Sequence, residues 1–168
     1  MAHSEFNIDQ ASIEQIRRKQ QVELNAFAIM PNHFHILAQE KEKNGIVRYL
    51  QRLQAGYAKY ANAKYERGGH LFRGSFRAVP VETNEQLLYL SAYIHRNPRS
   101  LIEWKGKEIS YPWSSYQDFV KENRWKGLLN PAIVRNQFQD VKSYKQFVET
   151  SSAKLKENEI RMGHLFLE

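Results

Sequence analysis

The sequence predicts a single α+β domain in which an antiparallel pair of strands packs with helices and a helical segment follows. Three observations support this fold class: two short apolar runs separated by Pro31-Asn32, a long run of apolar residues at helical spacing, and a length of 168 residues. A chain of this length is expected to fold around one core of its own. We place the main part of the domain at about residues 9–100 and a C-terminal helical cap at about 101–168.

Three helices are expected before residue 100. In residues 9–20, Ile13 and Ile16 lie in an otherwise polar run, which indicates a short helix. Apolar residues then recur at three- and four-residue spacing from Ile46 to Tyr60 and predict a long helix to about Glu66, ended by Gly68-Gly69. The third helix begins at a capping box and ends near Asn97; the box is Thr83 with Gln86, and the stop is Pro98.

The strands are expected at three places. Residues 22–30 first alternate between apolar and polar side chains and then become continuously apolar, which indicates a strand. Residues 33–39 are again strand-like, and the tight turn at Pro31-Asn32 favours pairing of the two strands as a hairpin. Residues 70–81 suggest a third strand, kinked near Gly74. In the cap, helices are expected near residues 113–119 and 143–150.

Composition restricts the chemistry. The chain has no cysteine, so a metal would be held by histidine, carboxylate, amide or water. No apolar run reaches the roughly 18 residues that a membrane span needs, and the amino terminus lacks a secretory signal pattern. We therefore expect a cytoplasmic protein with no membrane partner.

The net charge of +7 is concentrated in one segment. Residues 45–80 contain a single acidic residue and account for six of the seven net charges; their basic residues are Arg48, Arg52, Lys59, Lys64, Arg67, Arg73 and Arg77. The same segment carries the rings of Tyr49, Tyr57, Tyr60, Tyr65, Phe72 and Phe76. Rings among cations suit stacking on unpaired bases and binding of phosphates. The alternative is that the rings belong to the core and the charges to a solvated helix face.

Two residue patterns are candidates for chemistry. His33 and His35 are two apart, so on a strand they would lie on one face, about 6.5 to 7 Å apart along the chain, and could converge on one metal ion. Ordinary surface histidines show the same spacing, so the pair needs a third ligand. Tyr93 and Asn97 share a helix face. If that face is turned toward the histidines, Asn97 would complete the metal shell and Tyr93 would lie near a bound phosphate; alternatively, Tyr93 is a half-buried helix residue and Asn97 a cap.

Four ordered motifs carry a resemblance to a known family. They are A-F-A-I-M-P-N-H-F-H-I-L (26–37), G-G-H-L-F-R-G-S-F-R-A (68–78), Y-I-H-R-N-P-R-S (93–100) and P-W-S-S-Y (112–116). Together they resemble the REP-associated tyrosine transposases, which belong to the HUH single-tyrosine transposases of the insertion-sequence two-hundred type. The similarity continues weakly to about Val148.

The resemblance implies a fold, a site and a substrate. The fold is a ferredoxin-like or RRM-like α/β sandwich with an antiparallel sheet and helices on one side. His33, His35 and Asn97 would bind one Mg²⁺ or Mn²⁺ ion, and Tyr93 would be the nucleophile. The substrate would be single-stranded DNA beside a hairpin, cut through a 5′-phosphotyrosine intermediate. Imidazole ligands favour later metals over magnesium, which makes manganese the ion to test first.

Other basic side chains complete the predicted DNA contacts. Arg96 and Arg99 join the seven basic residues of 45–80, because a guanidinium engages phosphate oxygens through two hydrogen bonds. Of the remaining histidines, His70 and His95 are expected to be structural or DNA-contacting rather than ligands.

One departure from the family concerns the sheet. Family members begin with a segment that contains the first strand, whereas about twenty residues precede Val22 here and they read as helix. We therefore expect the first family strand to be missing, which favours self-association as a homodimer. Two rival functions remain: a non-catalytic RRM-like nucleic-acid-binding protein, and a metal-dependent nuclease that uses water.

Overall fold

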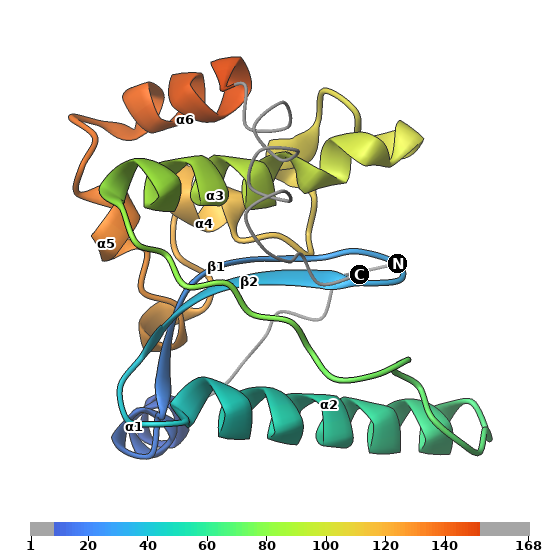
Figure 1. Ribbon diagram of the computed structural model, residues 1–168. Helices are drawn as coiled ribbons and strands as arrows, with labels where there is room; N and C mark the ends of the chain where they lie inside the picture. Colours follow the sequence, from blue (N-terminus) through green and yellow to red (C-terminus); the bar gives the residue numbers. More distant parts are fainter. Residues whose placement is uncertain (1–8, 152–168) are drawn as a thin grey trace.

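The computed structural model describes residues 9–151 and shows the α+β fold that the sequence predicts (Figure 1). The main elements, in chain order, are α1 (Gln10–Arg18), β1 (Val22–Ile29), β2 (Phe34–Glu40), α2 (Gly45–Lys64), α3 (Asn84–Arg96), α4 (Tyr116–Val120), α5 (Ala132–Arg135) and α6 (Val141–Thr150). Short 3₁₀ turns η1 (Asn97–Ser100), η2 (Ile102–Trp104), η3 (Glu108–Ser110) and η4 (Lys126–Leu128) connect the later helices. Among these helices, none is long and apolar enough to cross a membrane.

The hairpin is confirmed. β1 and β2 pair antiparallel from Val22 opposite Glu40 to Ile29 opposite Phe34. The Pro31-Asn32 turn is closed by the Met30 amide, which donates to the His33 carbonyl at 2.8 Å. His33 therefore belongs to the end of the turn, and β2 begins one residue after it.

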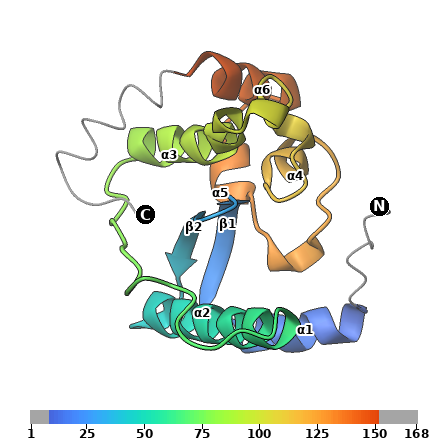
Figure 2. The same ribbon diagram turned by 90° about the vertical axis from the view of Figure 1, so that its right-hand side faces the viewer.

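Helices cover both faces of this sheet. In Figures 1 and 2 the hairpin lies between α2 with α1 on one side and α3 with the later helices on the other. The expectation of helices on one side only was wrong. The reason is visible in β1, where the consecutive residues Ala26, Phe27 and Ala28 are all buried, and a strand whose successive side chains are all apolar needs cover on both faces.

The outer edge of β1 is covered by residues 111–115. The Ile29 amide donates to the Trp113 carbonyl at 2.8 Å, and the Ser115 amide donates to the Phe27 carbonyl at 2.9 Å. Ser114 forms an isolated bridge with Ala28. These contacts satisfy an edge that would otherwise expose its backbone groups. Before β1, Gln10–Arg18 is helical, as the sequence predicts.

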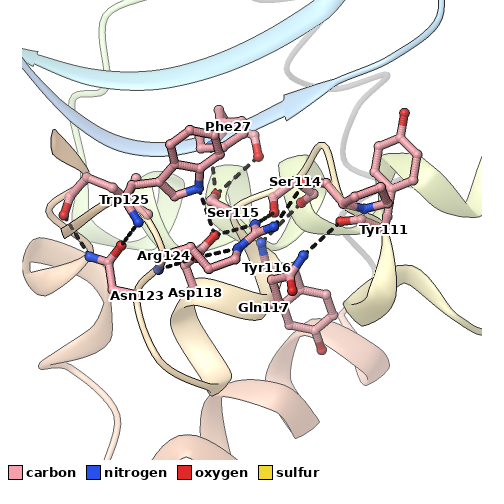
Figure 3. A network of polar contacts seen from close by, with 12 residues as sticks. Phe27, Tyr111, Ser114, Ser115, Tyr116, Gln117, Asp118, Asn123, Arg124 and Trp125 are labelled. Carbon is pink, nitrogen blue, oxygen red and sulfur yellow. Dashed lines mark hydrogen bonds and ion pairs between the residues drawn. The ribbon is translucent and has the colours of Figure 1, made fainter. Parts of the chain in front are cut away.

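A polar network fixes residues 111–115 to the following loop (Figure 3). Asp118 is fully buried and accepts from the Nε and Nη2 atoms of Arg124 at 2.9 and 2.8 Å, and from Nε1 of Trp125 at 3.2 Å. Arg124 Nη2 also donates to the Ser114 carbonyl at 2.9 Å. The edge cover is thus held by a charge pair and not by sheet pairing alone.

The strand predicted at residues 70–81 was wrong. The structure shows no regular element there, and the segment runs back beside α2 toward α3 (Figure 1). Its largest apolar residues are only half-buried, and Phe72 contacts the rings of Phe34 and Tyr57 while its backbone is not paired with a strand. Alternating apolar residues form a strand only where a backbone ladder is available.

The start of α3 follows the sequence closely. Thr83 Oγ1 accepts from the Gln86 amide at 3.1 Å, and the Gln86 side chain accepts from the Glu82 amide at 2.8 Å. These two bonds satisfy amides at the exposed end of the helix. The capping residues therefore set where α3 begins, and with it the position of the residues near its other end.

Candidate functional site

The two predicted ligand histidines lie side by side at the start of β2. The ring centroids of His33 and His35 are 4.9 Å apart, at an interplanar angle of 84°. Nδ1 of His33 lies 2.7 Å from Oδ1 of Asn32, which restrains that ring. His35 is 9% exposed and sits opposite Ala28 in the hairpin.

The end of α3 meets the same place. The ring of Tyr93 lies 5.3 Å from the ring of His35, and the side chain of Asn97 contacts His35. Nδ2 of Asn97 donates to the Tyr93 carbonyl at 3.2 Å, so its amide caps the last turn of α3. The structure therefore brings together His33, His35, Tyr93 and Asn97, which we call the active-site cluster because they are the catalytic and metal-binding residues that the sequence predicts.

The electrostatics keep His35 neutral. Burial, and secondly the neighbouring charge of His33, lower the pKa of His35 from 6.5 to about 4, and the contact with Asn97 offsets part of this shift. A metal ligand must present an unprotonated nitrogen. His35 is therefore in the required protonation state at neutral pH.

The residues present fit a divalent metal. The Nε2 atom of His35 is buried and has no hydrogen-bond partner within the part of the chain that the structure describes. An uncompensated buried nitrogen is costly, and a metal ion would satisfy it. No group of three or more histidine, aspartate or glutamate residues occurs among residues 9–151, so the third protein ligand would come from an amide such as Asn97. Two imidazoles and an amide oxygen suit manganese better than magnesium.

A cavity of about 150 Å³ adjoins the cluster and is lined by residues of β2, α2, the segment of residues 77–81 and α3. His35 and Tyr93 both line it, together with Tyr49 of α2 and Arg77. Its remaining lining is largely apolar. The cavity beside the cluster therefore contains the guanidinium of Arg77.

The predicted DNA contacts fall into two groups. Seven lie on α2 and the segment after it: Arg48, Arg52, Lys59, Lys64, Arg67, Arg73 and Arg77. All but the half-buried Arg48 are exposed. Arg48 pairs with Glu42 at 2.7 Å and Arg52 donates to Gln21 at 3.3 Å.

The second group lies at the end of α3 and in η1. Arg99 is held by Glu108, with 2.6 Å between Nε and Oε1, and Arg96 is half-buried. Burial lowers the pKa of Arg96, and Arg99 lowers it further. These two arginines lie beside the cluster in the chain, but Arg99 would have to share its guanidinium between Glu108 and a phosphate.

The other histidines differ sharply in their surroundings. His95 is fully buried, with Nε2 2.8 Å from Ser115 Oγ and Nδ1 2.7 Å from the hydroxyl of Tyr144. His95 is therefore a structural residue, which is one of the two roles, structural or DNA-contacting, that the sequence predicts. His70 is exposed.

Trp113 and Tyr111 have no role that the sequence predicts. Trp113 is 54% exposed, and its carbonyl is bound to Ile29 next to the hairpin turn. The Tyr111 hydroxyl donates to the Ile29 carbonyl at 2.7 Å. The signal for Trp113 was the motif at residues 112–116, whose position beside β1 depends on the tertiary fold.

A comparison with protein-family models finds one described as "Transposase IS200 like", which matches residues 8–97, more than half of the chain. The matched stretch contains all four residues of the active-site cluster. Searches of curated proteins and of solved structures find no match.

Proposed function

The chain belongs to the IS200-like transposase family, and on this premise we propose that it cuts and rejoins single-stranded DNA beside a hairpin through a covalent bond to Tyr93. The observation that supports this most directly is the active-site cluster, in which a tyrosine on α3 lies against a buried histidine of β2. A nucleophile beside a potential metal ligand is the arrangement that phosphoryl transfer to a side chain needs.

In the proposed reaction, the phenolic oxygen of Tyr93 attacks the scissile phosphorus. A bond forms between that oxygen and the 5′-phosphate, the bond to the 3′-oxygen breaks, and the phenolic proton ends on the released 3′-hydroxyl. Attack by a new 3′-hydroxyl reverses these steps and frees the tyrosine. Rejoining needs no external energy source, because one phosphodiester is exchanged for another.

Residues of the chain would prepare this step. His33 and His35, with the amide oxygen of Asn97, would hold one Mn²⁺ or Mg²⁺ ion, which when bound supplies Lewis-acid polarisation of the phosphate. The perpendicular packing of His35 on Tyr93 restrains the tyrosine ring. Asn97 links the two, since its Nδ2 binds the Tyr93 carbonyl while its side chain contacts His35.

Tyr93→Phe tests the proposal. The protein is incubated with Mn²⁺ and labelled single-stranded hairpins, and protein-linked DNA is sought on a denaturing gel. We expect an adduct with the wild-type chain and none with Tyr93→Phe, because the variant keeps the ring and loses only the attacking oxygen. Tyr57→Phe is the matched control and should form the adduct normally.

The same gel separates the rival functions. If DNA is cleaved without forming an adduct, and the cleavage persists in Tyr93→Phe, the protein is a nuclease that uses water. Hairpin binding without cleavage under any divalent metal would leave a non-catalytic nucleic-acid-binding protein. Sedimentation of the free protein and of the hairpin complex tests the predicted homodimer. The proposal also includes that the protein acts on DNA in the cytoplasm.

A further inference from the structure

The second half of α2 and its C-cap residue Tyr65 expose a row of aromatic rings. Tyr57, Tyr60 and Tyr65 are 56%, 55% and 63% exposed, whereas Leu50 in the first half of the helix is 5% exposed. We call these three residues the tyrosine row. Large rings are ordinarily buried, so three exposed ones on a single helix end indicate a surface that meets a partner.

The rings continue toward the active-site cluster. Ring centroids are separated by 6.3 Å from Tyr60 to Tyr57, 6.2 Å from Tyr57 to Phe72, and 6.3 Å from Phe72 to Phe34. Phe34 is the residue between His33 and His35. In Figure 1 the end of α2 and the β1–β2 turn lie at the same end of the molecule. Successive side chains of a strand point to opposite faces, so Phe34 lies on the other face of β2 from His35, and the rings lead to the strand that carries the cluster.

Cations border the row. Lys64 Nζ lies 5.4 Å from the centre of the Tyr60 ring and 5.5 Å from that of Tyr65, and it donates to the Tyr60 hydroxyl at 3.1 Å. Lys59 is exposed on the same half of the helix. The surface therefore combines flat rings with positive charge, and its complement is a polyanion that carries exposed flat rings of its own.

We propose that the tyrosine row stacks on unpaired bases of the DNA strand that leads into the active-site cluster, while Lys59 and Lys64 bind its phosphates. The proposal rests on the proposed function for the identity of the strand. Single-stranded DNA fits better than duplex, since a duplex hides its base faces, and better than a protein partner, since the charge around the row is mainly positive, with Glu66 as the one acidic residue of 45–80.

Paired substitutions on the row test the proposal through binding alone. The full chain is titrated against a labelled oligothymidylate without metal, and fluorescence anisotropy gives the Kd. Tyr57→Leu/Tyr60→Leu keeps apolar side chains but removes the rings, and we expect binding at least about tenfold weaker, the lower range for losing stacked bases. Tyr57→Phe/Tyr60→Phe retains the rings and should bind within about twofold of the wild type.

Controls separate stacking from general effects. Ile102→Ala alters another exposed apolar residue, 91% exposed on η2, and should leave the Kd unchanged. Lys64→Gln should reduce the slope of log affinity against log salt by about 0.7, the value for one phosphate contact to a single strand. Circular dichroism of each variant verifies that it is folded.

Several results would overturn the inference. The leucine pair could bind oligothymidylate like the wild type, or lose affinity equally for a duplex of the same length, in which case bases are not stacked on the row. Tighter binding of oligouridylate would assign the surface to RNA, and a dimer that the leucine pair dissociates would assign it to a second copy of the chain. The binding assay contains no metal and does not depend on catalysis. Weaker binding by the leucine pair therefore supports the inference even if no Tyr93 adduct forms. If the adduct forms but the leucine pair binds like the wild type, the inference is refuted and the proposed function stands.

Discussion

Asn97 connects the two halves of the active-site cluster. Its Nδ2 atom donates a hydrogen bond to the Tyr93 carbonyl, and its side chain contacts His35. The amide is therefore oriented by groups from both α3 and β2. The amide oxygen is the atom of this side chain that would bind a cation. Asn97 lies at the end of α3 and is the first residue of η1.

Substituting Asn97 tests its role as a ligand. We expect Asn97→Leu to weaken Mn²⁺ binding at least about tenfold, since removal of even an outer partner of a metal site costs that much. Asn97→Asp keeps an oxygen and adds charge, so it should bind Mn²⁺ at least as tightly as the wild type. Electron paramagnetic resonance of free Mn²⁺ during titration measures both. Equal affinity of the leucine variant and the wild type would exclude Asn97 from the metal shell.

His95 shows how burial affects stability. Burial lowers its pKa from 6.5 to about 3 in the folded chain, where it accepts from the Tyr144 hydroxyl if its own proton is on Nε2 toward Ser115. The unfolded chain regains a pKa of about 6.5. Between these values the unfolded state binds more protons, so protonation favours unfolding.

We therefore expect the free energy of unfolding to fall as pH decreases below about 6.5, by about 1.4 kcal/mol per pH unit for His95. His35, with a pKa lowered to about 4, adds a similar slope over most of this range. Urea denaturation at several pH values measures the total. His95→Gln keeps hydrogen-bonding groups without titrating, and should reduce the slope by about half; an unchanged slope would show that His95 does not contribute.

At the scale of elements, the segment of residues 111–125 stabilises the open edge of the hairpin. Ser115 binds Phe27 through both backbone and side chain, with its Oγ accepting from the Phe27 amide at 2.8 Å. The Asp118–Arg124 pair then holds this segment to the next loop (Figure 3). Trp125 adds a ring contact with Phe27 at 5.5 Å. The two-stranded sheet is therefore completed by a loop, not by a further strand among the described residues.

Asp118→Ala tests this arrangement. The change leaves the guanidinium of Arg124 without its carboxylate, and we expect a loss of about 3 kcal/mol, the lower end for breaking a buried pair because Arg124 is 34% exposed. For a chain of this size, that corresponds to a fall in Tm of about 6 to 12 °C. Lys145→Ala, which breaks an exposed pair with Glu149, is the control and should change stability by under about 0.5 kcal/mol. Similar melting of the two variants would contradict the assigned role.

At the scale of the molecule, one core extends across the boundary predicted near residue 100. Ala28 of β1, Ala92 and Ile94 of α3, Phe119 of α4 and Tyr144 of α6 belong to the same buried cluster. The fully buried His95 packs on Tyr116, Phe119 and Tyr144, all from the C-terminal part. The segment after residue 100 therefore completes the core and does more than cap it.

A chain that ends at residue 100 should consequently fail to fold. Truncation would expose the buried face of α3 and leave both ring nitrogens of His95 without partners. We expect the fragment to lack a cooperative thermal transition by circular dichroism, whereas the full chain should unfold in one transition. A fragment that melts cooperatively would show that residues 9–100 form a domain by themselves.

Local sequence patterns determined most of the elements. The spacing of apolar residues predicted α1 and α2, the capping box predicted the start of α3, and Pro31-Asn32 predicted the hairpin turn; the structure confirms each. The motifs also singled out the four residues of the active-site cluster and the family. The helices and the turn depend on residues within a few positions of one another, and the sequence shows the order of those residues directly.

Only the tertiary structure decided the features that depend on distant partners. The sequence could not establish that Tyr93 and Asn97 reach His35, because that contact joins an α3 face to a β2 face through a shared core. Residues 70–81 have a strand-like pattern but no backbone partner, while residues 111–115 lack such a pattern and still cover β1. Burial likewise separated the enclosed His95 from the exposed tyrosine row, since residue type alone does not tell which side of a helix meets the core and which meets water.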